Sequence, residues 1–62
     1  MPYVEIKAFE SRFEDEAVAE RLIAALTDAV CEVFGESARD QTWVVVEGVP
    51  KRHWGFGGKV SG

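Results

Sequence analysis

Residues 14–34 read EDEAVAERLIAALTDAVCEVF, and this stretch decides the fold. Its apolar side chains recur every three or four residues, which is the spacing of one face of an α-helix. They are Val18, Leu22, Ala25, Leu26, Ala29, Val30 and Val33. Acidic residues crowd the first turn, where they stabilise the positive end of the helix dipole, and Gly35 follows as a C-cap. The sequence therefore predicts one long helix from Glu14 to Phe34 with a single apolar face.

A predicted strand lies on each side of this helix. Residues 3–9, YVEIKAF, alternate so that Val4, Ile6 and Ala8 share one face, which we expect to be buried. Residues 41–47, QTWVVVE, form a nearly continuous apolar run, which is typical of a strand covered on both faces or buried in a larger assembly. Strand, long helix and strand make a βαβ unit, so we expect parallel strands and a right-handed connection.

The remaining segments are short connections and a tail. Residues 37–40 favour a short capped turn, and residues 48–50, Gly-Val-Pro, are expected to break the second strand. Residues 53–60 contain glycines spaced by aromatic side chains and have the character of a hairpin. The predicted fold class is α+β: a β-α-β protomer with parallel strands, a short C-terminal hairpin and sheets that pack in an oligomer.

The length allows a single domain, residues 1–62, with no linker. A chain of roughly 60 residues buries only about 60% of its unfolded surface and is marginal alone. Cys31 is the only cysteine and His53 the only histidine, so neither an internal disulfide nor a four-ligand structural metal site is expected. Oligomerisation is then the expected source of stability, and the 47% hydrophobic content supports burial between subunits.

The net charge of −4 argues against a nucleic-acid partner, because such proteins carry a basic face. No apolar run approaches the roughly 20 residues of a membrane span, so no membrane partner is expected. There is no basic segment followed by an apolar one at the start, as a secretory signal would require. A single unpaired cysteine fits a reducing compartment, and we expect a cytoplasmic protein.

Pro2 directly follows Met1. If Met1 is removed, the nitrogen of Pro2 becomes a secondary amine, which is a base, whereas an amide nitrogen is not. The predicted strand that follows would fix this amine to a sheet, although chain termini are usually mobile unless an element ties them down. Pro2 is therefore a candidate general base.

Several features combine into a pattern. They are Met1-Pro2 before a strand, Arg12 after it, Leu22-Ile23 on the helix, a Val-rich strand ending in Glu47, and the tail His53-Trp54-Gly55-Phe56-Gly57-Gly58. Over essentially its whole length the chain resembles the 4-oxalocrotonate tautomerase family. The resemblance implies a β-α-β protomer, commonly assembled as a homohexamer (a trimer of dimers). It also implies cofactor-independent isomerase chemistry, in which the amino-terminal proline moves a proton between carbon and oxygen of a small anionic enol or keto acid.

The resemblance also implies roles for individual residues. Pro2 is then the base, Arg12 binds the carboxylate or carbonyl end of the substrate, and Trp54 stands where the family has an aromatic wall. A second substrate-binding arginine of the family is replaced here by Thr42. Arg39 or Arg52 is expected to substitute for it, because both are near in sequence to the site residues.

The chemistry of a proline base sets its own requirements. A free α-amine has a pKa near 8, and a secondary amine is more basic still. An apolar wall of Trp54, Phe56 and Phe9 would disfavour the charged ammonium and lower the pKa of Pro2, and Arg12 would lower it further by repulsion. The same arginine would hold an acid with two parallel hydrogen bonds.

Structural interpretations stand beside the functional ones. Arg12 is alternatively a surface arginine paired with Glu14 or Asp15, and Trp54 an aromatic side chain at a subunit interface. His53 is more often a structural histidine than a catalytic one, and Cys31 is expected to pack in the core. Thr42 is alternatively an ordinary strand residue.

Three functions remain open from the sequence. The leading one is a tautomerase acting on a small 2-oxo acid. The second is other chemistry of the same superfamily, such as that of a dehalogenase or decarboxylase with protonated Pro2 as an acid, or a hydratase-like reaction. The third is a catalytically inactive oligomeric subunit.

Overall fold

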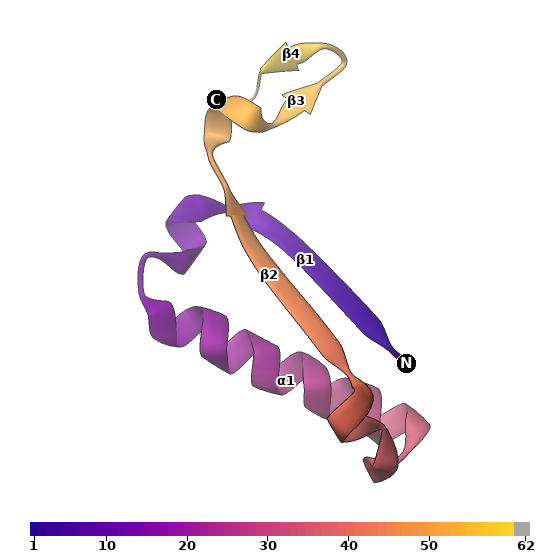
Figure 1. Ribbon diagram of the computed structural model, residues 1–62. Helices are drawn as coiled ribbons and strands as arrows, with labels where there is room; N and C mark the ends of the chain where they lie inside the picture. The colour runs from indigo at the N-terminus through magenta and orange to yellow at the C-terminus, as the bar shows by residue number, and fades with distance from the viewer. Residues whose placement is uncertain (61–62) are drawn as a thin grey trace.

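A computed structural model describes residues 1–60 of the chain (Figure 1). Two parallel strands lie beside one long helix, and a small hairpin follows at the C-terminal end. The strands are β1 (Tyr3–Phe9), β2 (Trp43–Val49), β3 (Gly55–Phe56) and β4 (Lys59–Val60). The α-helix is α1 (Glu16–Phe34), and the short 3-10 helices are η1 (Glu10–Phe13), η2 (Glu36–Gln41) and η3 (Lys51–His53). The predicted β-α-β protomer with parallel strands and a C-terminal hairpin is confirmed.

The helix begins two residues later than predicted, at Glu16. Asp15 has extended backbone angles and its side chain accepts a hydrogen bond of 2.9 Å from the Ala17 amide, so it is the N-cap rather than a helical residue. The helix ends as predicted at Phe34. Gly35 has φ 101°, a left-handed conformation that favours glycine, and its amide donates to the Cys31 carbonyl over 2.8 Å.

The second strand is shifted by two residues from its predicted range, 41–47. Gln41 belongs to η2, and the strand continues through Gly48 and Val49, so the prediction that these residues break it is wrong. Gly48 is needed within the strand because η1 crosses close above it: a Cβ there would lie 2.9 Å from the Glu10 Cα. The strand ends before Pro50, which has no amide hydrogen to donate.

One face of the sheet is covered by α1, and the other is open in the protomer. On β1, Val4, Ile6 and Ala8 lie on the half-buried face, as predicted, and Val44 and Val46 are half-buried on β2. The opposite face carries the register pairs Tyr3–Trp43, Glu5–Val45 and Lys7–Glu47. Lys7 donates to Glu47 over 2.8 Å, while Tyr3, Trp43 and Val45 are exposed.

The predicted apolar face of the helix is only partly correct. Val18, Leu22, Leu26 and Val30 are half-buried, and Cys31 is the one fully buried apolar side chain among residues 1–60, at 6% exposure. Ala25, Ala29 and Val33 are exposed in the protomer. The side of the helix that meets the sheet is instead formed by two neighbouring rows of residues, 18–22–26–30 and 19–27–31. Periodicity showed that an apolar face exists but misplaced its centre.

The protomer is thin and elongated. Its principal extents are 43 × 26 × 14 Å, and its radius of gyration is 14.3 Å. A compact chain of this length would have a radius of gyration of about 11 Å. Figure 1 shows the reason: the hairpin extends beyond the end of the sheet, away from α1. None of the helices formed by residues 1–60 has the length and apolar character that a membrane crossing requires.

Candidate active site

The predicted site residues fall at two opposite ends of the β1–β2 sheet. Because the strands are parallel, Pro2 and Thr42 lie together at the end where both strands begin. Arg12 and Trp54 lie beyond the other end, where both strands finish. A strand of seven residues separates the two ends by about 20 Å. One chain therefore does not bring Pro2 to Arg12.

The Arg12 end holds an open cavity of about 250 Å³, which we call the aromatic pocket. It is lined by Ala8, Phe9, Arg12, Trp54 and Phe56. The rings of Phe9 and Trp54 meet edge to face, with centroids 5.2 Å apart and planes at 75°. The Trp54 indole Nε1–H donates to the Val49 carbonyl over 3.1 Å. These two contacts fix the indole, so the pocket has a preformed wall.

Arg12 is placed at the pocket by η1. This short helix folds back over the end of the sheet, where Ala8 and Gly48 are register partners and leave room for it. Within residues 1–60, Arg12 forms no hydrogen bond and no ion pair. Its predicted alternative partner Asp15 caps α1 instead, so the pairing of Arg12 with Glu14 or Asp15 is not what the protein forms. The guanidinium is available to an anionic ligand, to which it can donate two parallel hydrogen bonds.

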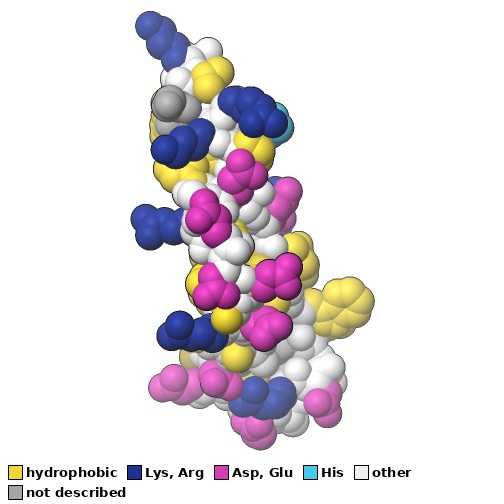
Figure 2. Space-filling model, turned by 90° about the vertical axis from the view of Figure 1, so that its left-hand side faces the viewer, with side chains coloured by type: hydrophobic (Ala, Val, Ile, Leu, Met, Phe, Trp, Pro, Cys, Tyr) yellow, Lys and Arg dark blue, Asp and Glu magenta, His cyan; other side chains and the backbone are white. Residues whose placement is uncertain are grey.

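Basic residues surround this end of the molecule. Residues 48–60 contain Lys51, Arg52 and Lys59 and no acidic residue, although the whole chain carries a charge of −4. Figure 2 shows the contrast: on this face the body carries acidic and basic side chains together, whereas the charged side chains around the hairpin end are basic. The Lys51 ammonium lies 5.9 Å from the centroid of the Phe9 ring. The charge distribution favours anions at the pocket.

At the other end of the sheet, Pro2 is anchored as predicted. It is half-buried, and its carbonyl accepts a hydrogen bond of 3.0 Å from the Trp43 amide, which fixes it to β2. Met1 precedes it and is 80% exposed. The nitrogen of Pro2 is thus attached to a rigid element rather than to a mobile tail.

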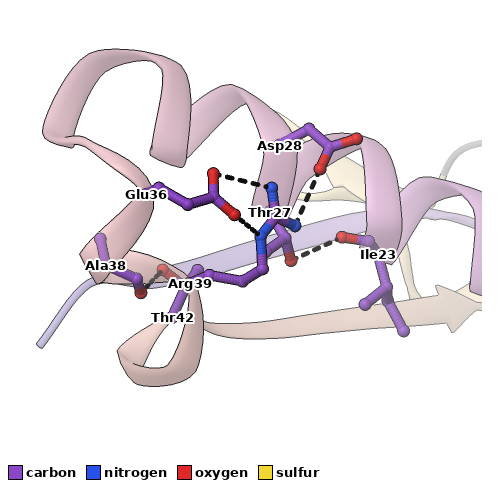
Figure 3. Close-up of polar contacts among 7 residues, drawn as sticks. All are labelled: Ile23, Thr27, Asp28, Glu36, Ala38, Arg39 and Thr42. Carbon is purple, nitrogen blue, oxygen red and sulfur yellow. Dashed lines mark hydrogen bonds and ion pairs between the residues drawn. The ribbon is translucent and has the colours of Figure 1, made fainter.

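Polar side chains of η2 and Thr42, which lead into the start of β2, are engaged within the chain (Figure 3). The Thr42 hydroxyl donates to the Ala38 carbonyl over 2.8 Å. Arg39 forms ion pairs with Asp28, over 2.9 Å, and with Glu36. The hydrogen bond from Arg39 holds the pKa of Glu36 below its ordinary value, and the pKa of Arg39 is raised, chiefly by Glu36. The structure thus gives Arg39 and Thr42 partners within the chain.

The other predicted residues lie near the pocket but outside its lining. Arg52 and His53 are exposed on η3, and the His53 amide donates to the Pro50 carbonyl over 2.9 Å. The importance of Ala8 and Gly48 was missed from the sequence. Two small residues at matched positions of paired strands would have been the signal, but the match is visible only once the register is known.

A larger hollow, of about 460 Å³, lies elsewhere, on the surface of α1. It is lined by Val18, Arg21, Leu22 and Ala25, and it contains no predicted site residue. Its size reflects the uncovered helix surface rather than a set of converging functional groups. The aromatic pocket, although smaller, is where an available cation meets a fixed apolar wall.

Comparison with known proteins assigns the chain to a family. The family model described as "Tautomerase enzyme" matches residues 2–62. The chain belongs to the tautomerase family. The family resemblance seen in the sequence is thereby confirmed, and with it the assignment to a superfamily of isomerase-type enzymes. Searches among curated proteins and among solved structures found no match. The tautomerase match spans both ends of the sheet, including Pro2, Arg12 and the aromatic tail.

Proposed function

We propose that this chain is a tautomerase in which the Pro2 amine, after removal of Met1, is the general base. It would interconvert the enol and keto forms of a small 2-oxo acid without a cofactor. The observation that carries the proposal is the aromatic pocket, where Arg12 has no partner within residues 1–60 and stands beside a fixed apolar wall. In a tautomerase family member with an anchored Pro2, such a pocket is suited to a small organic anion.

The proposed reaction is a proton transfer between two atoms of the substrate. The substrate carboxylate accepts hydrogen bonds from the Arg12 guanidinium, which also stabilises the negative charge that develops on the enol oxygen. The Pro2 amine takes the proton from the enol hydroxyl and becomes an ammonium. The ammonium then gives its proton to the substrate carbon as the C=O bond forms. The amine is regenerated, and atoms and charge balance.

The proposed base needs a lone pair near neutral pH. The apolar walls of Phe9, Trp54 and Phe56 would disfavour the ammonium form when Pro2 of another chain enters the pocket. The positive charge of Arg12 would act in the same direction. Both effects lower the pKa of the Pro2 amine towards the working pH, where a general base is most effective.

The separation of Pro2 and Arg12 leads us to propose that the site forms between chains of a homo-oligomer, for which a hexamer is favoured. Pro2 of one chain would meet the aromatic pocket of another. The exposed sheet face with Tyr3, Trp43 and Val45 supports association. A protomer that fully buries one apolar side chain among residues 1–60 has little core of its own.

The decisive experiment is an assay of ketonisation by protein whose intact mass shows that Met1 is absent. Phenylenolpyruvate and 2-hydroxymuconate are the enol acids to supply. Arg12→Ala should lower kcat/KM by roughly 10²–10³-fold, as for removal of an oxyanion donor. Pro2→Ala replaces the secondary amine with a primary amine and should lose activity in part. Arg21→Ala removes the same charge from α1 and serves as the control. Full activity of Pro2→Ala, or of protein that retains Met1, would overturn the proposal.

A further inference from the structure

The aromatic pocket has a single cationic group in its lining. Arg12 supplies it, and the rest of the lining is Ala8 and three aromatic side chains. Trp54 adds no polar group for a ligand, because its indole N–H already donates to the Val49 carbonyl. A bound molecule therefore finds one partner for one carboxylate, and a wall that can only contact apolar surface.

Among residues 1–60, the Pro2 end of the sheet supplies no unpaired second cation. Arg39 is the arginine there, and it is held between the carboxylates of Asp28 and Glu36. One guanidinium between two carboxylates leaves the cluster with a net negative charge, which repels a second substrate carboxylate. The Thr42 hydroxyl proton is also in use, in the hydrogen bond to Ala38. A dicarboxylate would have to break these contacts to gain a second partner.

Lys51, Arg52 and Lys59 are the other cations at this end, and all three are exposed and lie outside the pocket lining. The Lys51 ammonium is held 5.9 Å from the Phe9 centroid, and the side chain is exposed to water. An ammonium in water is strongly hydrated and gives a point charge rather than a fork of two donors. Lys51 therefore helps to attract anions to this end without fixing a second carboxylate in the pocket.

The pocket has room for a ring. An apolar cavity of roughly 150 Å³ admits benzene. The aromatic pocket, at about 250 Å³, is larger, and it is lined by the three aromatic side chains Phe9, Trp54 and Phe56. A planar apolar substituent on the substrate would contact these rings, whereas a second carboxylate in the same place would be a charge against hydrocarbon, which is costly unless it is paired.

Building on the proposed function, we propose that the substrate is a 2-oxo acid with one carboxylate and a planar apolar substituent, aromatic or alkenyl, and that dicarboxylic acids are disfavoured. Arg12 holds the carboxylate, and the aromatic pocket takes the substituent. The cluster of Asp28, Glu36 and Arg39 excludes the second carboxylate.

The test compares phenylenolpyruvate, an aromatic mono-acid, with 2-hydroxymuconate, a diacid, on one preparation. We expect kcat/KM to favour the mono-acid by roughly 100-fold, because burying an unpaired carboxylate is costly. Trp54→Ala should raise KM for the mono-acid with little change in kcat. A diacid preference, or a diacid activity that Lys51→Ala or Arg52→Ala removes, would overturn the inference while leaving the proposed tautomerase function standing.

Two further arms do not depend on wild-type turnover. Calorimetric titration with the unreactive acids 3-phenylpropionate and adipate should show tighter binding of the mono-acid, and Arg12→Ala should abolish it. If the mono-acid binds but neither enol is turned over, the proposed function fails and the ligand class stands. The double variant Asp28→Asn with Glu36→Gln frees Arg39 and should raise diacid use relative to mono-acid use. An unchanged ratio in that variant would overturn the role of the cluster.

Discussion

The two ends of the β1–β2 sheet differ in how their polar groups are used. At the Pro2 end, Arg39 and Thr42 are paired with groups of the same chain, so the Pro2 nitrogen is the group left there for a proposed catalytic role. At the Arg12 end, the guanidinium has no partner within residues 1–60, and the aromatic side chains leave a cavity. The Pro2 end holds the proposed base, and the Arg12 end holds the available cation and the pocket. This difference is the reason for our proposal that each chain contributes half of a site at each end and that two chains complete it.

The largest effect is expected from inactivating the Pro2 end in one variant and the Arg12 end in another. An N-terminal extension makes the Pro2 nitrogen an amide and should abolish activity. Arg12→Ala should lower kcat/KM by roughly 10²–10³-fold. When the two inactive proteins are unfolded together and reassembled, some sites pair an intact Pro2 from one chain with an intact Arg12 from the other. About one quarter of sites should recover if association is random. Activity per site, with oligomer size checked by light scattering, is the measurement.

Each inactive protein, reassembled alone, is the control for this experiment. If Pro2 and Arg12 of the same chain served one site, no mixture would yield a site with both groups intact. The absence of any recovery in oligomers shown by mass to be mixed would therefore contradict a site shared between chains.

An intermediate effect is expected from a change under η1 that disturbs the Arg12 end alone. In Gly48→Ala the new Cβ would lie 2.9 Å from the Glu10 Cα, a backbone atom that cannot turn aside. Overpacking of this kind costs about 1–3 kcal/mol of stability. Because η1 carries Arg12, kcat/KM should fall as well. Denaturant unfolding at fixed protein concentration gives the stability change.

Gly55→Ala is the matched control for Gly48→Ala, since a Cβ there would meet the Lys59 carbonyl oxygen at an ordinary 3.4 Å. Its unfolding midpoint should stay close to that of the wild type. Equal destabilisation by the two variants would show that the close approach of η1 to β2 is not what Gly48 is needed for.

The smallest effect is expected at the Pro2 end, from the pairing of Glu36 with Arg39. The hydrogen bond from Arg39 lowers the pKa of Glu36 from its ordinary 4.5. A lowered pKa means that the pair stabilises the folded protein above pH 4.5 and that this contribution is lost as the pH falls through the folded-state value. Glu36→Gln should therefore lower the thermal midpoint slightly at pH 7 and not at all in strong acid.

The effect at Glu36 is small because the side chain is exposed and water screens the pair. Glu32→Gln, on the exposed side of α1, removes a carboxylate that has no ion-pair partner among residues 1–60 and should leave the midpoint unchanged at both pH values. A midpoint difference for Glu36→Gln that persists in strong acid would mean that the pair is not its cause.

Most of the fold was predictable from the sequence because β1 and α1 are determined by local patterns of apolar and polar residues. The alternation in residues 3–9 and the spacing in residues 14–34 located β1 and α1, and Gly35 marked the helix end, since each depends only on neighbouring residues. The errors fell at positions set by contacts distant in sequence. Gly48 looked like a strand breaker, but it is a strand residue that η1 requires to be small.

The candidate site was predictable in its parts and not in its arrangement. Trp54, Phe9 and Phe56 were expected to form an apolar wall, and they line one pocket with Arg12. Arg39 or Arg52 was expected to replace a second substrate arginine. In the structure α1 and η2 surround Arg39 with Asp28 and Glu36, whereas Arg52 is exposed on η3. Nearness in sequence says which residues can meet, whereas the direction of a side chain depends on the element that packs against it.

The sequence by itself determined the order of strand, helix and strand, the glycine-rich tail and the membership of the tautomerase family, because periodicity and motif spacing are properties of the chain alone. Only the tertiary structure brought Arg12 together with Phe9, Trp54 and Phe56 in one pocket, and Thr42 to the end of the sheet that holds Pro2. The physical reason is the parallel crossover. It brings the beginnings of both strands together and their ends together, and the rigid length of β1 then keeps the amine and the guanidinium of one chain apart.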